Sequence, residues 1–393
     1  NNVLSTPGGI IDNCNFRGMY TNNFFKGRGL SDENSAIKLF NFEGSYQKIP
    51  FTIDTAFINN FKTPVATGVL KSKFDIAKLN SVLGDELLQF TAGEADLNLT
   101  YSADLVDLRL RKPYFTGYVN IKNADVNYKP RNLHFKNTGI SLKFTGPDLF
   151  INDLRLQSGK SILSMQGSIK NFLNLYYTAP EKIVLNWDIS SPQLHLGEFL
   201  AFLNSRPAVK QAKRGRSSNL SSDLNALFES SNVNLNLKVD KIYYKKFLAT
   251  NAVSQMYVSK KGIEIKNTRV NHANGSINVE GNLYQTGNAT RFALDAIITN
   301  ANVKSLFYGF DNFGLESIKH ENISGNLFSK VKLNGRISGS GALVPNSLNG
   351  LIAFNLKNGA LINFQPLINV GKFAFPLRDL NDIRFSDLGG ALD

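Results

Sequence analysis

The chain has 393 residues, of which 42% are hydrophobic and 19% charged, so it can bury a sizeable core and is not a wholly disordered protein. Its formal net charge of +13 is compatible with binding to nucleic acid, with binding to an anionic membrane surface, or with a charged surface that only keeps the protein soluble. The Lys and Arg residues are mostly scattered singly, which favours a solvated basic surface, and no nucleic-acid partner is expected. The single cysteine, Cys14, excludes an intramolecular disulfide and a cysteine metal cluster.

The termini predict a fragment of a longer protein. Asn1 is not followed by a signal segment, and no run approaches the ~20 apolar residues that span a bilayer. We therefore expect a membrane anchor or export signal upstream of Asn1 and further strands after Asp393.

Residues 1–117 form the first of five expected segments and are rich in predicted strands. Ile53, Thr55 and Phe57 alternate with their neighbours, which is typical of a strand with one apolar face. The stretch Phe74–Phe90 changes to helical spacing, so we expect a helix near residues 75–90.

The second and fourth segments, 118–205 and 233–333, contain two copies of one β unit. In both copies the apolar positions change parity inside the first strand, which requires a bulge or a break. The copies align over 118–169 and 233–283, with the following residues in equivalent places: Tyr128 and Tyr244, Gly159 and Gly275, Gly167 and Gly281.

The third segment, 206–232, is predicted to be a basic loop followed by a short helix. Its cations lie among Pro, Gly and Ser without an apolar period, which favours a solvated loop, with an anionic membrane surface as the alternative partner. Candidate contacts to such a surface are Arg206, Lys210, Lys213, Arg214 and Arg216.

Short alternating segments run into one or two apolar helical turns at four places. These are residues 74–83, 194–203, 301–310 and 362–373. Helices this short and this few cannot cover the apolar side of so many strands. Either a second sheet or a ligand must therefore cover it.

Nothing in the sequence indicates catalysis. The histidines, His134, His195, His272 and His320, are isolated and are expected at surface or turn positions. The carboxylate pairs Asp104–Asp107 and Asp379–Asp382 fit polar turns, because glycoside hydrolysis needs two carboxyls placed across a cleft. We expect no enzyme activity, no cofactor and no metal.

The fifth segment, 334–393, is the most regular. Ile352, Phe354 and Leu356 alternate with polar or small residues, and the alternation resumes after Asn358-Gly359 with Ala360, Ile362 and Phe364. An Asn-Gly pair inside such a pattern predicts a tight turn between two strands. A short helix and a strand around Ile383 and Phe385 are expected to follow.

This segment resembles the C-terminal region of the AsmA family of Gram-negative envelope proteins. The resemblance is strongest over Gly335–Phe385. It is carried by Gly339, Gly341, Leu348, Gly350, Phe354, Leu356, Gly359, Phe364 and Pro366.

The resemblance implies a mostly β fold, an elongated, twisted, repetitive antiparallel sheet curved into a trough, with an open sandwich as the alternative and few short helices. It also implies a periplasmic protein tethered to the inner membrane that moves phospholipid towards the outer membrane, with envelope-assembly proteins as further candidate partners. The alternative without lipid is an envelope scaffold, or a surface protein that binds glycan or protein. The apolar residues expected to contact lipid are Val233, Leu235, Leu237, Val239, Ile352, Phe354, Leu356, Ile362 and Phe364.

Overall fold

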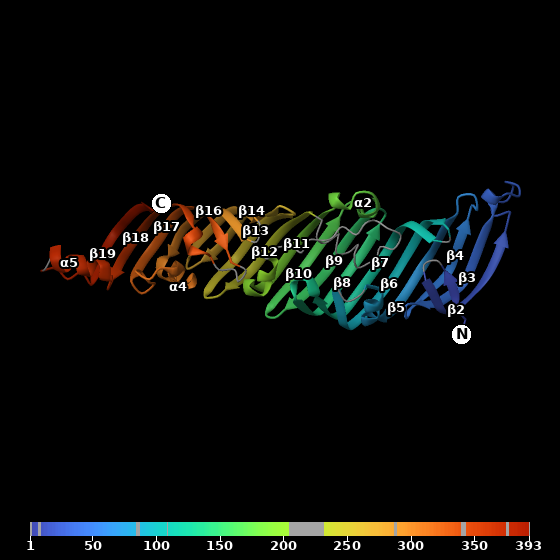
Figure 1. Ribbon diagram of the computed structural model, residues 1–393, viewed down its shortest axis with the longest axis horizontal. Coiled ribbons are helices and arrows are strands. Elements are labelled where there is room, and N and C mark those ends of the chain that lie inside the picture. The colour runs from blue at the N-terminus through green and yellow to red at the C-terminus, as the bar shows by residue number, and fades with distance from the viewer. Residues whose placement is uncertain are drawn as a thin grey trace. The chain divides into compact units, whose positions relative to one another are not determined.

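The computed structural model describes residues 2–6, 9–83, 87–107, 109–203, 232–286, 289–338, 343–374 and 377–392. In these ranges the protein is mostly β, with a 19-stranded, mostly antiparallel open sheet and a few short helices (Figure 1). The predicted fold class is confirmed. A single sheet is formed in the described part, rather than the two packed sheets of a sandwich.

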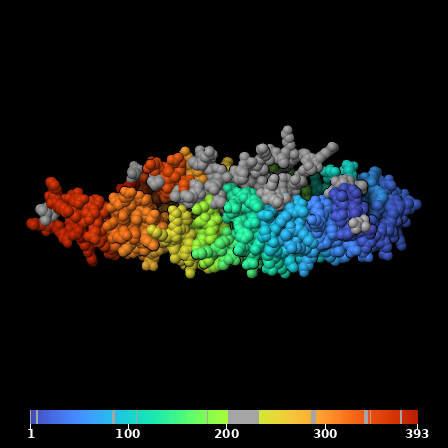
Figure 2. Space-filling view, turned by 60° about the horizontal axis from the view of Figure 1, so that its bottom comes forward, coloured from blue at the N-terminus to red at the C-terminus, as the bar shows by residue number. Residues whose placement is uncertain are grey.

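The chain divides into two compact units, and the first contains most of the residues up to Trp187. Each of its strands pairs antiparallel with the next. Most connections are short turns, but residues 22–35 separate β2 from β3 and residues 76–87 separate β5 from β6. Figure 2 shows these strands as successive bands of the surface, from blue to teal. The strands are β1 (Leu4–Thr6), β2 (Gly9–Thr21), β3 (Ala36–Tyr46), β4 (Ile49–Asn59), β5 (Val65–Asp75), β6 (Leu88–Val106), β7 (Arg109–Tyr128), β8 (Leu133–Thr145) and β9 (Asp148–Ser158).

The second unit contains Val233–Asp393 and repeats the same meander. Again each strand pairs antiparallel with its successor. The strands are β12 (Asn232–Tyr244), β13 (Phe247–Ser259), β14 (Gly262–His272), β15 (Gly275–Thr286), β16 (Ala289–Asn302), β17 (Ile323–Ile337), β18 (Asn349–Ile362) and β19 (Asp382–Leu392). Two further strands, β10 (Ser161–Ile169) and β11 (Val184–His195), contribute residues to both units.

Bulges built on left-handed residues recur in strand after strand. Asn and Asp adopt this conformation more readily than other residues with a side chain, which explains the abundance of Asn in strands that would otherwise avoid it. The register shifts beside several of these residues, and a bulge bends the strand and increases its twist. The positive-φ residues inside strands include Asn13, Asn41, Asn123, Asn137, Asp153, Asn251, Asn267, Asn300 and Asn358.

The predicted change of apolar parity is confirmed in both copies of the repeat. In β7, Lys122 and Asn123 are exposed one after the other, and in β12 Asp240 and Lys241 are. In the first copy the register shift falls between Ile121 and Ala124, at the left-handed Asn123 itself. In the second, the shift lies in the neighbouring strand β13, where Asn251 is left-handed.

A bulge of the same kind lies in the fifth segment, where a turn was predicted. Residues Asn349–Ile362 form one continuous strand, so the expected turn at Asn358-Gly359 is wrong. Asn358 is instead the left-handed residue of a bulge, with φ of 49°. An Asn-Gly pair satisfies both geometries, and only the pairing of β18 with β17 and β19 along its whole length distinguishes them.

The four predicted helical inserts are confirmed. They are η2 (Ile76–Leu79) with α1 (Asn80–Leu83), η5 (Leu196–Leu203), α4 (Val303–Gly309) and α5 (Gln365–Ala374). The first is shorter than the expected 75–90, because Phe74 belongs to β5 and β6 already begins at Leu88. A further helix, α2 (Phe172–Thr178), follows β10.

The two predicted copies correspond to β7–β10 and β12–β15. Tyr128 and Tyr244 are the last residues of β7 and β12, respectively. Gly167 and Gly281 lie so close to the next strand that an added Cβ would meet the Trp187 ring at 2.8 Å or the Ala293 carbonyl oxygen at 2.4 Å. The division into five segments stays a prediction.

We predict that Asn358→Val lowers the free energy of unfolding by about 1–2 kcal/mol, because a β-branched residue resists the left-handed conformation. Asn358→Gly is expected to be close to neutral. The control is Asn278→Val, on an exposed, regular position of β15, which we expect to cost almost nothing. Urea unfolding of the three variants measures this, and equal losses at 358 and 278 would contradict the assignment of the bulge.

Candidate functional site

In the second unit, one face of the sheet carries most of the apolar side chains, and we call it the inner face. Cross-strand partners line up in rows that run perpendicular to the strands. One row, the open row, consists of Leu235, Met256, Ile265, Gly281, Leu294 and Leu333. A parallel one, the closed row, continues from Val270 through Ile277, Ile298 and Ser329 to Phe354, with Val239 and Ala252 on the first two strands.

Burial is deeper in the closed row than in the open row. In the closed row Val239 is 0% exposed, Ala252 2% and Ile277 8%, whereas Val270, Ile298 and Phe354 are half-buried. Every member of the open row is only half-buried. A further half-buried row, formed by Val279, Ala296, Val331 and Ile352, lies between them. Among the apolar side chains of these rows, burial is therefore deepest in the closed row on β12, β13 and β15, and the open row is half-buried throughout.

Short helices provide the cover on the closed side. Phe199 of η5 packs on a cluster that includes Val239 and Ile242. In α4, Val303 and Leu306 are buried, and the Phe310 ring lies 4.6 Å from that of Phe247. Helices this short bury a few side chains each, which is enough for the strand ends but not for the middle of the sheet.

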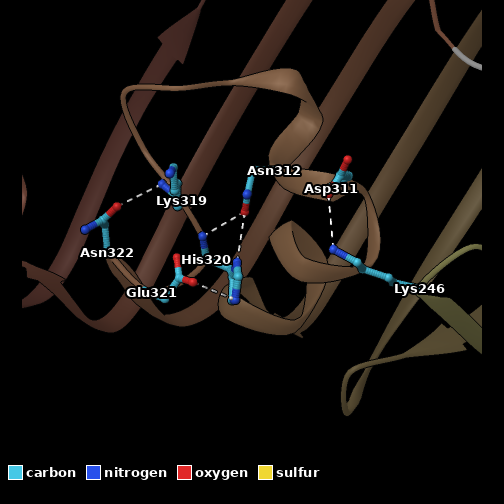
Figure 3. A network of polar contacts seen from close by, with 7 residues as sticks. All are labelled: Lys246, Asp311, Asn312, Lys319, His320, Glu321 and Asn322. Atoms are coloured by element: carbon cyan, nitrogen blue, oxygen red, sulfur yellow. Dashed lines mark hydrogen bonds and ion pairs between the residues drawn. The ribbon is translucent and has the colours of Figure 1, made fainter.

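The loop after α4 is held by polar contacts (Figure 3). The carboxylate of Asp311 lies 3.3 Å from Nζ of Lys246 in the turn between β12 and β13. Asn312 Oδ1 accepts a hydrogen bond from the backbone N–H of His320 and lies 3.1 Å from its Nδ1. Nε2 of the same ring lies 3.2 Å from Glu321. These contacts fix the insert over the strand ends and leave the open row untouched.

The apolar face of the first unit also has half-buried residues. Leu97, Val119 and Leu142 are cross-strand neighbours there, and Leu97 and Leu142 pack against core clusters. Ile76 and Leu83 of η2 and α1 pack into a core cluster at one end of these strands.

At the other end of those strands, α2 covers a second core cluster around Leu149 and Ile151. The Tyr177 hydroxyl of α2 donates a hydrogen bond of 3.0 Å to the carbonyl oxygen of Pro113. Burial raises the pKa of Tyr177 to about 12, so this hydroxyl keeps its proton.

The predicted lipid-contact residues of β12 share one face. Val233, Leu235, Leu237 and Val239 pair with Val258, Met256, Ser254 and Ala252. Val239 is fully buried core, and Leu237 packs on the cluster around it. Only Val233 and Leu235 lie away from this core.

The predicted lipid-contact residues of the fifth segment lie in different environments. Ile352 and Phe354 are half-buried on the inner face, whereas Leu356 is core at 2% exposure. Ile362 lies beyond the bulge and is 37% exposed, and Phe364 follows the end of the strand. The candidate residues on β12 and those on β18 are connected by the cross-strand rows of β13–β17. The apolar residues of these five strands also alternate with period two in the sequence, but they are not included among the predicted lipid contacts.

The other candidate residues are not brought together. Arg206, Lys210, Lys213, Arg214 and Arg216 lie outside the described residues. Of the histidines, His272 is buried at the end of β14, directly before a turn; its Nδ1 lies 2.7 Å from the Leu248 carbonyl oxygen.

The two carboxylate pairs lie on the surface. Asp104, Asp107, Asp379 and Asp382 are all exposed, and Asp382 pairs with Arg384 at 2.9 Å. Across the described ranges, no three His, Cys, Asp or Glu side chains group so that they could hold a metal ion.

The structure adds a cavity that the sequence did not indicate. It has a volume of about 340 Å³ and lies where β15, β16 and β17 end. Two arginines that lie far apart in the chain, Arg291 and Arg336, are directly opposite one another in the register of β16 and β17. The full lining is Tyr284, Arg291, Phe292, Asn334, Gly335, Arg336 and Ser347.

Comparison with known proteins identifies one family. The model of the AsmA family matches residues 63–379. No curated protein and no solved structure matches the chain. Within the described residues, no helix combines the length and the apolar character that a bilayer-spanning helix needs.

The contrast between the rows predicts different costs of truncation. Leu306→Ala, in buried α4, should lower the free energy of unfolding by about 2–5 kcal/mol, because it leaves a cavity. Leu333→Ala, in the open row, should cost about 1 kcal/mol or less, since water already reaches its side chain. Denaturant unfolding of both variants checks this. A loss at Leu333 as large as that at Leu306 would mean that the open row is covered.

Proposed function

The chain belongs to the AsmA family, and from this premise we propose that its inner face binds the acyl chains of phospholipids and carries lipid between the inner and outer membranes. Membership implies an AsmA-like protein of the bacterial envelope, in a family that is generally non-enzymatic. Lipid transport in turn would sustain the integrity of the outer membrane.

The observation that carries the proposal is the open row. Apolar side chains that stay half-buried on a single sheet lose part of the hydrophobic stabilisation that a second layer would provide. Acyl chains supply that layer without any change in the protein's own packing. A lipid chain gains ~0.8 kcal/mol for each CH₂ that it buries.

The dimensions of the face fit such a ligand. Strands lie ~4.8 Å apart, so the rows from β12 to β18 extend for roughly 29 Å across the sheet. This is close to the ~30 Å of a bilayer's hydrocarbon core, which two acyl chains fill end to end. One chain would therefore contact the side chains of about half of these strands.

Contacts of this kind are non-directional, because dispersion and hydrophobic burial depend on area rather than on particular donors and acceptors. A chain could slide from strand to strand along a row with little change in free energy. We further propose that the protein lies in the periplasm, tethered to the inner membrane, with its sheet curved into a trough and with envelope-assembly proteins as further candidate partners.

The test is native mass spectrometry with lipid extraction, on the chain purified from a bacterial host without harsh detergent. Phospholipid should co-purify in near-stoichiometric or larger amounts. A stable, monodisperse protein that carries no lipid would contradict the proposal and favour the scaffold or the glycan- or protein-binding alternative.

A matched pair of variants on β18 locates the contact. Phe354→Asp places a charge on the inner face and should reduce co-purifying lipid roughly tenfold, because burying a charge beside an acyl chain is costly. Ala353→Asp adds the same charge on the opposite face, next to Lys330, and should leave lipid unchanged.

Folding is checked by circular dichroism, and Leu333→Asp and Leu237→Asp repeat the test at the open row and beside the core. Folded inner-face variants that keep their lipid would place the acyl chains elsewhere. Leu237 packs on the buried cluster, so unfolding confined to Leu237→Asp would mark that position as core.

A further inference from the structure

The cavity at the ends of β15, β16 and β17 brings two positive charges together. Arg291 and Arg336 face one another across two neighbouring strands, where Cβ atoms lie ~5 Å apart. Like charges in this position destabilise a sheet. Their side chains have no hydrogen-bond or ion-pair partner among the described residues.

The strands around the two arginines contain few carboxylates. The only acidic residues on β15, β16 and β17 are Glu280 and Asp295. Asp295 lies four positions from Arg291, or about 13 Å along the strand, which exceeds the screening length of ~8 Å at physiological ionic strength. Asp295 also lies directly opposite Lys332. The two guanidinium groups therefore form a local concentration of positive charge.

The remaining lining suits a phosphate group. Tyr284 lies opposite Arg291 in the register, 40% exposed, and its hydroxyl can donate a hydrogen bond. Two guanidinium groups can each bind phosphate oxygens through paired N–H donors. The Ser347 hydroxyl holds the wall in place, since it accepts from the Arg336 backbone N–H at 2.8 Å and donates to the Val344 carbonyl oxygen at 2.7 Å.

The position of the cavity connects it to the inner face. Phe292, buried at 4% exposure, and Gly335 belong to the inner face, in the row that also contains Leu283. Arg291 and Arg336 belong to the opposite face. The cavity thus lies at the margin where apolar surface gives way to positive charge, as a lipid with an anionic headgroup requires.

We propose that this cavity binds a phosphate group through Arg291 and Arg336, and that the group is the headgroup phosphate of a lipid whose chains lie on the inner face. The second part rests on the proposed function. The first part does not, because free inorganic phosphate has the same chemistry.

The test uses isothermal titration of the whole chain with three probes, each kept below its micelle concentration where it forms micelles. They are dihexanoyl phosphatidylglycerol, dihexanoylglycerol, which lacks the phosphate, and inorganic phosphate. We expect the double variant Arg291→Gln/Arg336→Gln to bind the phospholipid roughly tenfold or more weakly. Its affinity for dihexanoylglycerol should not change, and Arg336→Lys, which keeps the charge but loses the paired donors, should be intermediate.

The matched control is Lys238→Gln/Lys330→Gln, which removes the same charge from exposed positions on β12 and β17. It should change phospholipid affinity less than threefold, and thermal unfolding should show that neither double variant is destabilised. If the arginine variant binds both the phospholipid and inorganic phosphate as the unmodified chain does, or if the two double variants lose equally, the site is overturned.

The same experiment distinguishes the phosphate of a lipid headgroup from free inorganic phosphate. Phosphate binding that is lost in the arginine variant and displaced by the phospholipid supports the headgroup assignment. Phosphate binding lost in that variant while phospholipid binding is unchanged overturns the headgroup assignment and leaves a site for free phosphate. If the unmodified chain binds neither lipid, the proposed function fails; if it binds both equally well, the headgroup assignment alone fails.

Discussion

An alternating strand has one apolar side, and a single sheet of such strands has an entire apolar face that water must not reach. In both compact units this requirement determines what else the chain contains. The inserts η2 with α1, α2, η5 and α4 follow strands and fold onto the strand ends, where they form the buried clusters. They stop short of the middle of the sheet, so the remaining apolar rows are left for something that is not part of the described chain.

The bulges also affect which apolar side chains are buried. A left-handed Asn within a strand reverses which residues point inward beyond it, so that Ala124 and Val126 are buried although Val119 and Ile121 have the other parity. In β7 the side chains beyond Asn123 join the core cluster that contains Ile76 and Leu83. A bulge also bends its strand. The left-handed Asn thus helps to decide which residues of this strand enter the core.

The positive charge at the ends of β16 and β17 lies at the edge of the apolar rows. A surface for acyl chains alone would need no charge, and the inner rows contain none. Arg291 and Arg336 lie on the other side of the same strands, at their ends, where a ligand leaving the apolar rows would meet them. A membrane lipid has this division between chain and headgroup. Along the middle of β15–β17, Asp295 lies between Glu280 on β15 and Lys332 on β17, so both signs are present there.

Much of the architecture was readable from the sequence, because alternation, helical spacing and the preferences of Asn and Gly are local properties. They predicted the strands, the four inserts and the parity change in the repeats, and the residues from Gly335 to Phe385 indicated the family. Asn358-Gly359 was misread, because a turn and a bulge use the same backbone conformation and differ only in whether the neighbouring strands continue. Which apolar residues are core and which are open, Leu356 against Ile352 for example, depends on where the helices fold back. The pairing of Arg291 with Arg336 across β16 and β17 depends on the register of these strands. Both are relations between distant parts of the chain, and only the tertiary structure decided them.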